Sequence, residues 1–479
     1  MKYLRRFLKA LGWLMLALGA LAAVGMAAVI VANWNDDPLS EAAQQALQYT
    51  PPTEQALEGN GYLILMGLDA PAEGNAVADA TALGRKRLAR EIERRRWVDA
   101  HGNQAEGMPP AIAVNNAAQS VLPDRLRCPL DEADCFAWFE KHGDEVQTLA
   151  TTHRALLQRL AAAASAPQFS NPSPSYLLHE LPPYGLLLRA YELWLAQASL
   201  AWMRGQPQQA MDIARQAMEV RSRLAVHSND LVTSMVALTM QHRELRWLSG
   251  ASAHADPQAQ PEIAQAIEQL LSTPPPSLHQ TLQGEMKFVA SVAHSMKDPD
   301  PGFFGRPWEE PIAWWQHALN RASAWAFLPK QTLNLLIRYW QQVQALSTLP
   351  AHEVETAVSN AMRQWDDDAA CSPWKHLRNA TGLCLAASGM SFHLNYMQRI
   401  ADIDGYRRLV LLQHRAAVEQ IAPADMPAWL AQSAQALRNP YTLEPMAWDA
   451  ATRSLVFEGR EKQNQNPDRS STYRVRLRG

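Results

Sequence analysis

Residues 229–250 read NDLVTSMVALTMQHRELRWLSG, and the spacing of their apolar side chains is helical. One face of this segment carries five residues four and three positions apart: Leu231, Met235, Leu238, His242 and Leu245. Such a stripe is typical of an amphipathic helix that faces a core, and we expect His242 to be packed within it. A second stripe follows further along the chain: Leu333, Leu336, Ile337, Trp340 and Val343.

The helical period continues through most of the chain and is interrupted by proline-rich breaks. We expect helices at 136–163, 184–204, 207–222, 229–250, 261–272, 279–295, 312–327, 331–347, 351–364, 384–421 and 424–437. The pattern therefore predicts a mainly α fold with a multi-helix domain over residues 61–438.

Composition excludes several classes of protein. Of 479 residues, 47% are apolar and 19% are charged, whereas soluble domains carry about 25% charged residues. A disordered chain is instead poor in apolar and rich in charged residues, so the composition excludes a mainly disordered protein. The 44 basic and 47 acidic residues give a net charge of −3, so we expect no nucleic-acid partner.

The N-terminus has the pattern of a membrane anchor. Residues 1–9 form a basic stub with four cationic side chains, and residues 10–34 carry no charge. At 1.5 Å per residue the uncharged run reaches about 37 Å, which exceeds a hydrocarbon core of about 30 Å. We expect a transmembrane signal anchor in a bacterial inner membrane. The positive charges place its N-terminus in the cytoplasm and the bulk of the chain in the periplasm.

A cleaved signal peptide is the alternative, because Ala20-Leu21-Ala22 is a small-x-small site. The residues that follow, AVGMAAVIVANW, are still apolar, and this favours an uncleaved anchor. Without the four cations of the stub, 40 basic and 47 acidic residues remain, a net charge of −7.

The folded part is flanked by two segments of different character. Residues 35–60 are polar and contain three prolines, which predicts a spacer between the membrane and the body. Residues 439–479 contain short alternating runs, which predict a β-hairpin or three-stranded meander packed on the helices. The apolar run Tyr62–Met66 fits either a strand or a buried helical turn.

The four cysteines form two close pairs, Cys128 with Cys135 and Cys371 with Cys384. In an oxidising compartment we expect each pair to form a local disulfide. Neither pair has the two-residue spacing of a zinc knuckle or a redox motif. We therefore expect no metal site and no cofactor.

Residues 85–96 hold seven cationic and two acidic side chains, a net charge of +5. One interpretation is a docking face for acidic lipids or an acidic partner. The other is a solvated helix face in which Arg87 pairs with Glu91, and this is the interpretation that we favour.

A search for catalytic motifs finds no H-E-x-x-H, G-x-S-x-G, P-loop or dinucleotide-binding pattern. The segment 298–315 combines aromatic and charged side chains, as saccharide-binding clefts do. Its candidate ligand-binding residues are Phe303, Phe304, Arg306, Trp308, Glu309 and Glu310. Adjacent Glu309 and Glu310 would point in different directions on a helix, so they do not form an acid/base pair by themselves.

The stretch Trp194–Val220 reads WLAQASLAWMRGQPQQAMDIARQAMEV and resembles a single tetratricopeptide repeat. Trp194, Ala198, Gly205, Ala210 and Ala217 fall at positions of that pattern. Ala214 replaces its usual aromatic residue, and no second copy follows in register. The resemblance implies a helical hairpin. More loosely, the arrangement of anchor, interrupted helices and β tail resembles that of membrane-anchored periplasmic proteins of proteobacteria. This resemblance implies no activity.

Two hypotheses of function follow. The anchor and the hairpin patterning, together with the lack of catalytic motifs, favour a periplasmic scaffold or adaptor that binds another envelope protein. The alternative is a periplasmic enzyme or binding protein that acts on an envelope saccharide or peptide through the 298–315 loop.

Overall fold

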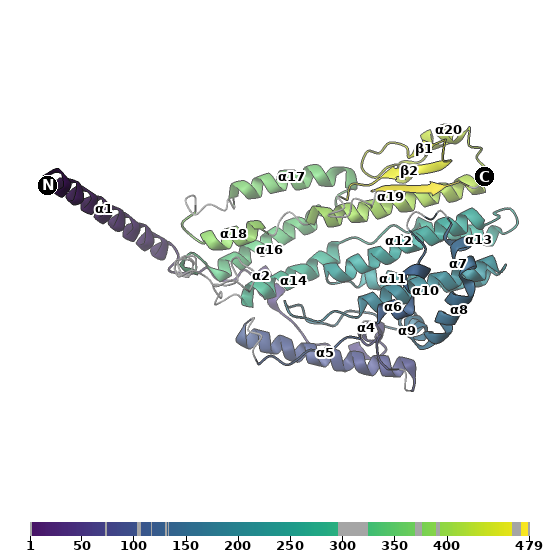
Figure 1. Ribbon diagram of the computed structural model, residues 1–479, viewed down its shortest axis with the longest axis horizontal. Coiled ribbons are helices and arrows are strands. Elements are labelled where there is room, and N and C mark those ends of the chain that lie inside the picture. The colour runs from purple at the N-terminus through teal and green to yellow at the C-terminus, as the bar shows by residue number, and fades with distance from the viewer. Residues whose placement is uncertain are drawn as a thin grey trace.

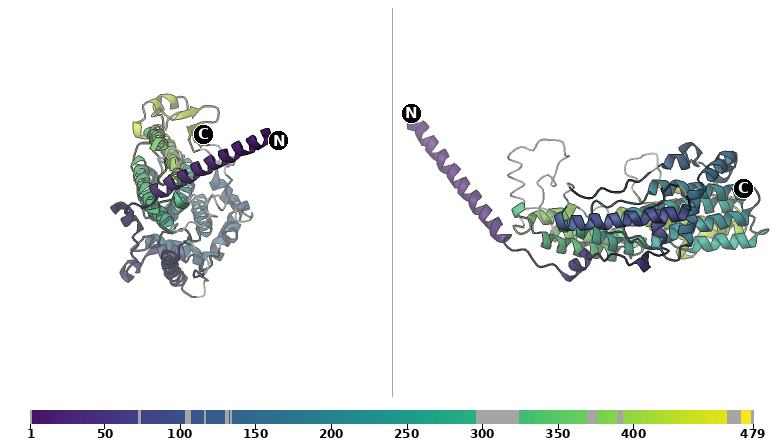
Figure 2. Two further views of the ribbon diagram at one scale, coloured as in Figure 1. Left: turned by 90° about the vertical axis from the view of Figure 1, so that its left-hand side faces the viewer. Right: turned by 90° about the horizontal axis from the view of Figure 1, so that it is seen from below.

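The computed structural model describes residues 2–71, 74–102, 107–115, 117–129, 132, 134–295, 324–368, 376–388, 393–461 and 471–477. Within these residues the protein is mainly helical, with a small β-sheet near the C-terminus (Figure 1). One long helix, α1 (Lys2–Ala32), projects from an elongated helical body (Figure 2). The expected mainly α fold is therefore confirmed.

Most of the helices expected from the sequence are present in the body. In chain order they are α2 (Glu41–Leu47), α3 (Glu54–Leu57), α4 (Gly61–Met66), α5 (Ala76–His101), α6 (Ala118–Val121), α7 (Cys135–Lys141), α8 (Gly143–Thr152), α9 (Arg154–Ser165), α10 (Tyr184–Met203), α11 (Pro207–Val226), α12 (Leu231–His254), α13 (Pro261–Ser272), α14 (His279–Ser295), α16 (Pro329–Leu346), α17 (Ala351–Asp368), α18 (Ala380–Ser388), α19 (His393–Val418) and α20 (Met426–Ala431). Short 3₁₀ turns lie at Asp124–Leu126 and Gln435–Leu437.

Helix α1 contains an apolar stretch, Arg6–Ala32, with a mean hydropathy of 2.6 and no buried part. Its 27 residues reach about 40 Å at 1.5 Å per residue, more than a hydrocarbon core needs. Among the described residues it is the one helix long and apolar enough to cross a membrane. A signal sequence near the N-terminus can meet the same criteria of length and composition, so whether α1 is retained stays a prediction.

The segment 35–60 differs from the expected spacer because it lies on the body. It contains α2 and α3, and Ala43 and Ala46 of α2 are 0% and 4% exposed where they pack beside α14 and α16. Small side chains on one face of α2 permit this close contact, although the segment is polar on average.

Helices α10 and α11 form an antiparallel hairpin with an alanine-lined contact. Ala198, Ala210 and Ala217 are fully buried, and Gly205 takes the positive φ of 77° that the turn requires. The helical hairpin expected over Trp194–Val220 is present, while its relation to tetratricopeptide repeats stays a prediction.

Helix α12 is covered on more than one side, so the single stripe expected for it is too narrow. It packs between α11 and α19, and buries Thr233, Ala237 and Glu244 in addition to Leu238 and Leu245. The second stripe, on α16, faces the core as expected: Leu333, Ile337, Trp340 and Val343 are all buried.

One long helix expected from the pattern is interrupted. The segment 136–163 is divided into α7, α8 and α9 at His142 and His153, whose ψ angles of 20° and 24° leave the helical range. Tyr62–Met66, which fitted either a strand or a helix, belongs to α4.

The C-terminal segment forms a three-stranded antiparallel meander with the order β1 (Ala447–Asp449), β2 (Ser454–Glu458) and β3 (Thr472–Arg476). Leu455 faces Val475 across the sheet. Phe457 covers Gly405 of α19, where a Cβ atom would lie 2.3 Å from the ring. The meander therefore packs on the helical body, as expected for a sheet too small to be stable alone.

Helices α4 and α5 cross at two glycines. A Cβ atom on Gly84 would lie 1.9 Å from the carbonyl oxygen of Leu63, and one on Gly67 would lie 2.0 Å from that of Ala80. Both contacts involve backbone, which cannot move aside as a flexible side chain can.

We predict that Gly84→Ala lowers the free energy of unfolding by more than about 2 kcal/mol, because the added methyl group forces α4 away from α5. Chemical denaturation of the full chain in detergent, followed by circular dichroism, measures the change. Gly143→Ala is the matched control, since its Cβ atom would meet nothing closer than 3.4 Å. Equal stability of Gly84→Ala and the wild type would show that the two helices do not make this contact.

Candidate functional site

The candidate ligand loop lies outside the described residues. This holds for the whole segment 298–315, including Phe303, Phe304, Arg306, Trp308, Glu309 and Glu310. The hypothesis that this loop binds a ligand therefore stays a prediction.

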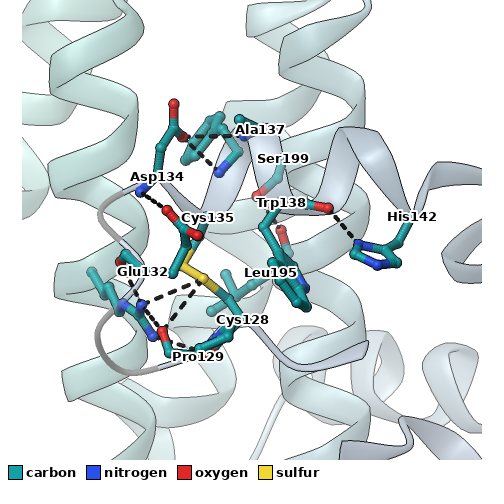
Figure 3. The surroundings of a disulfide bond; sticks show 12 residues. Cys128, Pro129, Glu132, Asp134, Cys135, Ala137, Trp138, His142, Leu195 and Ser199 are labelled. Carbon is teal, nitrogen blue, oxygen red and sulfur yellow. Dashed lines mark hydrogen bonds between the residues drawn. A yellow bond between two sulfur atoms is a disulfide. The ribbon is translucent and has the colours of Figure 1, made fainter. Parts of the chain in front are cut away.

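The Cys128–Cys135 disulfide is present and joins the start of α7 to the segment before it (Figure 3). Arg246 of α12 donates to the carbonyl oxygens of Cys128 at 3.2 Å, Glu132 at 2.8 Å, and Pro129. Asp134 caps α7 by accepting from the backbone N–H groups of Phe136 and Ala137. These contacts hold the disulfide loop against the body.

The second expected disulfide is described at one end only. Cys384 is disulfide-bonded, whereas Cys371 lies outside the described residues. The pairing of Cys371 with Cys384 stays a prediction.

The cationic stretch 85–96 is only partly a solvated face, because three of its arginines are buried. Arg87, Arg94 and Arg95 are 7%, 4% and 5% exposed, and Glu91 is 2% exposed, whereas Lys86 and Arg96 are exposed. Arg87 makes its ion pair with Asp69, at 2.5 and 2.8 Å, in place of the expected Glu91. The three buried arginines therefore serve the interior of the protein.

Each of these arginines also donates to the backbone of an irregular segment. Arg87 donates to the carbonyl oxygens of Met66 at 2.6 Å and Ala113 at 2.7 Å. Arg94 donates to the carbonyl oxygen of Leu178 at 2.7 Å, and Arg95 to that of Ser175. The proline-rich segment 171–183 is thereby tied to α5.

Glu91 completes this attachment from the same helix face. Its carboxylate accepts from the Tyr176 hydroxyl at 2.5 Å and from the Glu180 backbone N–H at 3.1 Å. Burial raises the pKa of Glu91, and the donated hydrogen bonds oppose that rise.

A second buried network links α10, α11 and α12. Arg221 of α11 pairs with Glu244 of α12 at 3.0 Å, and the Tyr191 hydroxyl donates to the same carboxylate. Glu244 is 2% exposed, and burial raises its pKa. Without Arg221, the carboxylate of Glu244 would be an unpaired charge in the core.

A groove lies where α17, α19 and the segment before β1 approach one another. Its volume is about 550 Å³, which is within the range of small-molecule sites. The lining is mostly apolar and includes Leu278, Leu349, Val354, Met397, Ile400 and Leu443. Sequence reasoning did not identify this groove, although Leu394, Met397, Ala401, Asp404 and Arg408 follow a helical spacing along one face of α19.

The charged groups of the groove are paired with one another. Asp404 accepts from Arg408 at 2.7 Å and from Arg407 at 2.8 Å. Arg460 contacts Glu355 at 2.5 Å and lies 4.5 Å over the ring of Tyr441. Because its carboxylates are already committed, the groove presents chiefly apolar surface to a ligand.

Two carboxylates meet where α14 packs on the start of α12. Glu285 accepts from the Leu231 backbone N–H at 2.6 Å, while Asp230 caps α12 by accepting from Thr233 at 2.7 Å. Burial, reinforced by the nearby charge of Asp230, raises the pKa of Glu285 to about 7. The middle of α14 is thus joined to the start of α12 through a carboxyl group with a raised pKa.

No group of three or more potential metal-ligating side chains occurs among the residues that the structure describes. No protein-family model, curated protein or solved structure matches the chain. The proposals that follow therefore rest on the chain's own residues.

We predict that ionisation of Glu285 destabilises the protein as the pH rises. Its pKa is higher in the folded than in the unfolded chain, so between about pH 4.5 and about pH 7 the folded state binds more protons. Relative to the wild type, Glu285→Gln should gain up to about 3 kcal/mol in the free energy of unfolding across this window.

Chemical denaturation at a series of pH values measures this difference. Glu262→Gln, at an exposed position on α13, is the matched control for the exchange of a carboxylate for an amide. A difference between Glu285→Gln and the wild type that stays constant across this window would contradict the raised pKa of Glu285.

Proposed function

We propose that the protein is a single-pass inner-membrane protein with its N-terminus in the cytoplasm. Its helical domain is periplasmic and acts as a scaffold or adaptor that binds another envelope protein. Residues 10–34 form the membrane anchor in this proposal.

The properties of α1 support the anchor. Its side chains from Arg6 to Ala32 are exposed to solvent in the isolated chain, which is unfavourable for an apolar helix outside a bilayer. The cationic residues that precede the span favour the proposed orientation. The Cys128–Cys135 disulfide suits an oxidising compartment such as the periplasm.

The groove beside α17 supports the proposal that the protein is an adaptor. Its lining is mostly apolar, and the carboxylates of Asp404 and Glu355 are paired with arginines. Such a surface suits the apolar side chains of a partner protein.

The rival proposal is a periplasmic enzyme or binding protein that acts on an envelope saccharide or peptide. It rests on the sequence of the 298–315 loop alone. The groove therefore takes precedence as the place to test.

We predict that a photo-crosslinking amino acid at Ala351, on the lining of the groove, captures a discrete membrane or periplasmic protein in living cells. The same amino acid at Asn360, an exposed position further along α17, is the matched control and should not capture it. Mass spectrometry of the crosslinked band identifies the partner.

A groove-filling variant makes this test specific. Ala401→Phe places a ring in the groove from α19 and should abolish the crosslink from Ala351 while the circular dichroism spectrum is retained. Capture that is equal at Ala351 and Asn360, or that survives Ala401→Phe, would contradict binding in the groove.

A further inference from the structure

The end of α1 is bound tightly to the body. The Asn33 side chain donates to the carbonyl oxygen of Leu377 at 2.7 Å and accepts from the backbone N–H of Asn379 at 2.7 Å. Arg378 donates to the carbonyl oxygens of Ala32 at 2.9 Å and Asn35 at 3.0 Å. The loop 377–379 is therefore held beside the last residue of the apolar span.

The residues after Asn33 are bound to a second element, α16. The carboxylate of Asp36 accepts from the backbone N–H groups of Lys330 at 2.7 Å and Gln331 at 3.1 Å, and so caps that helix. Asn334 of α16 exchanges hydrogen bonds with the backbone of Pro38 and Ser40. We call residues 33–40 and their partners in 377–379 and α16 the juxtamembrane clamp.

Asn379 joins the two partners of the clamp to each other. It is 2% exposed and has a φ of 54°, a conformation that asparagine tolerates better than most residues. Its side-chain oxygen accepts from the Leu328 backbone N–H at 2.8 Å and from the Thr332 hydroxyl at 3.1 Å. The loop, the start of α16 and the end of α1 thus form one connected unit.

Large apolar side chains are exposed at this unit. Trp34 is 75% exposed, Trp325 is 50% exposed and Leu377 is 49% exposed. Among the described residues outside α1, Trp34 and Trp325 are the tryptophans that appear as exposed large apolar side chains. Single exposed apolar residues are common on soluble proteins, but these three come from separate segments that the clamp brings to one end of the body.

Hydrogen bonds hold Leu377 and Trp325 close to the residue at which the apolar span ends. The carbonyl of Leu377 is one hydrogen bond away from Asn33, which directly follows the apolar stretch that ends at Ala32. Trp325 adjoins Ala326, whose carbonyl accepts from the backbone N–H of Thr381 at 3.2 Å. If α1 spans a bilayer, the clamp holds both side chains near the level at which the helix leaves it.

We propose that this end of the body contacts the bilayer surface through Trp34, Trp325 and Leu377. The partner is the headgroup region of the phospholipid bilayer that α1 crosses. Tryptophan favours this region because its ring is apolar while its N–H group can still reach water or a headgroup.

This inference rests on the proposed membrane anchoring and adds a property to it. A flexible tether would leave the body free to reorient, whereas the juxtamembrane clamp and the bilayer contact hold it in one orientation. Figure 1 shows α2, α16 and α18 at the end where α1 joins, and the β-sheet at the opposite end. The groove and the β-sheet would then face partners at a set distance from the membrane.

Fluorescence quenching in vesicles tests the proposal on the full chain. The protein is reconstituted into vesicles of phosphatidylethanolamine and phosphatidylglycerol that contain a lipid with a quencher at the headgroup. Leu377→Cys and Trp325→Cys are each labelled with an environment-sensitive fluorophore while the native cysteines stay oxidised. We expect several-fold stronger quenching at both positions than at Val418→Cys, which is 38% exposed at the end of α19.

A label at Val24→Cys in α1, quenched by a lipid with its quencher deep in the acyl chain, reports anchoring separately. Quenching at Val24 with Leu377 and Trp325 no more quenched than Val418 would overturn the surface contact and leave the anchor intact. No quenching at Val24 would overturn the anchor and the surface contact together. Quenching at Val24, Leu377 and Trp325, but not at Val418, supports both.

Discussion

Buried arginines that donate to backbone carbonyl oxygens hold the irregular segments of this protein against its helices. A connection without regular structure leaves carbonyl groups unpaired, and burial of such groups is unfavourable unless a donor reaches them. The guanidinium group offers five N–H donors on a long side chain. Arg159, which is 3% exposed, shows the arrangement clearly: it donates to the carbonyl oxygens of Leu68, Pro71 and Ala76, and so holds the connection between α4 and α5.

Less deeply buried arginines hold other connections in the same way. Arg94 and Arg95 hold the segment 171–183, Arg246 holds the disulfide loop, and Arg378, whose side chain is 40% exposed, holds the end of α1. The cationic stretch 85–96 is misleading for this reason, since a count of charges does not reveal that the proline-rich segment 171–183 covers Arg94 and Arg95.

Local patterns predicted the elements whose environment is simple. The bounds of α13 and α14 match the expected segments 261–272 and 279–295, and the C-terminal strands fall close to where alternation placed them. Long-range contacts account for what the sequence could not reveal. Burial of α12 on several sides depends on α19, which is distant in the chain, and the groove exists only where α17, α19 and the segment before β1 meet. The spacer expected over residues 35–60 failed for the same reason, because Asp36 finds its partners on α16.

Retention of α1 in the mature protein is required for both the membrane anchor and the bilayer contact. Intact-mass measurement of the chain isolated from washed membranes tests this directly. We predict a mass that includes the basic stub and the whole of α1, in a protein that stays with the membrane under alkaline conditions. A soluble chain that begins at Ala23 would contradict it.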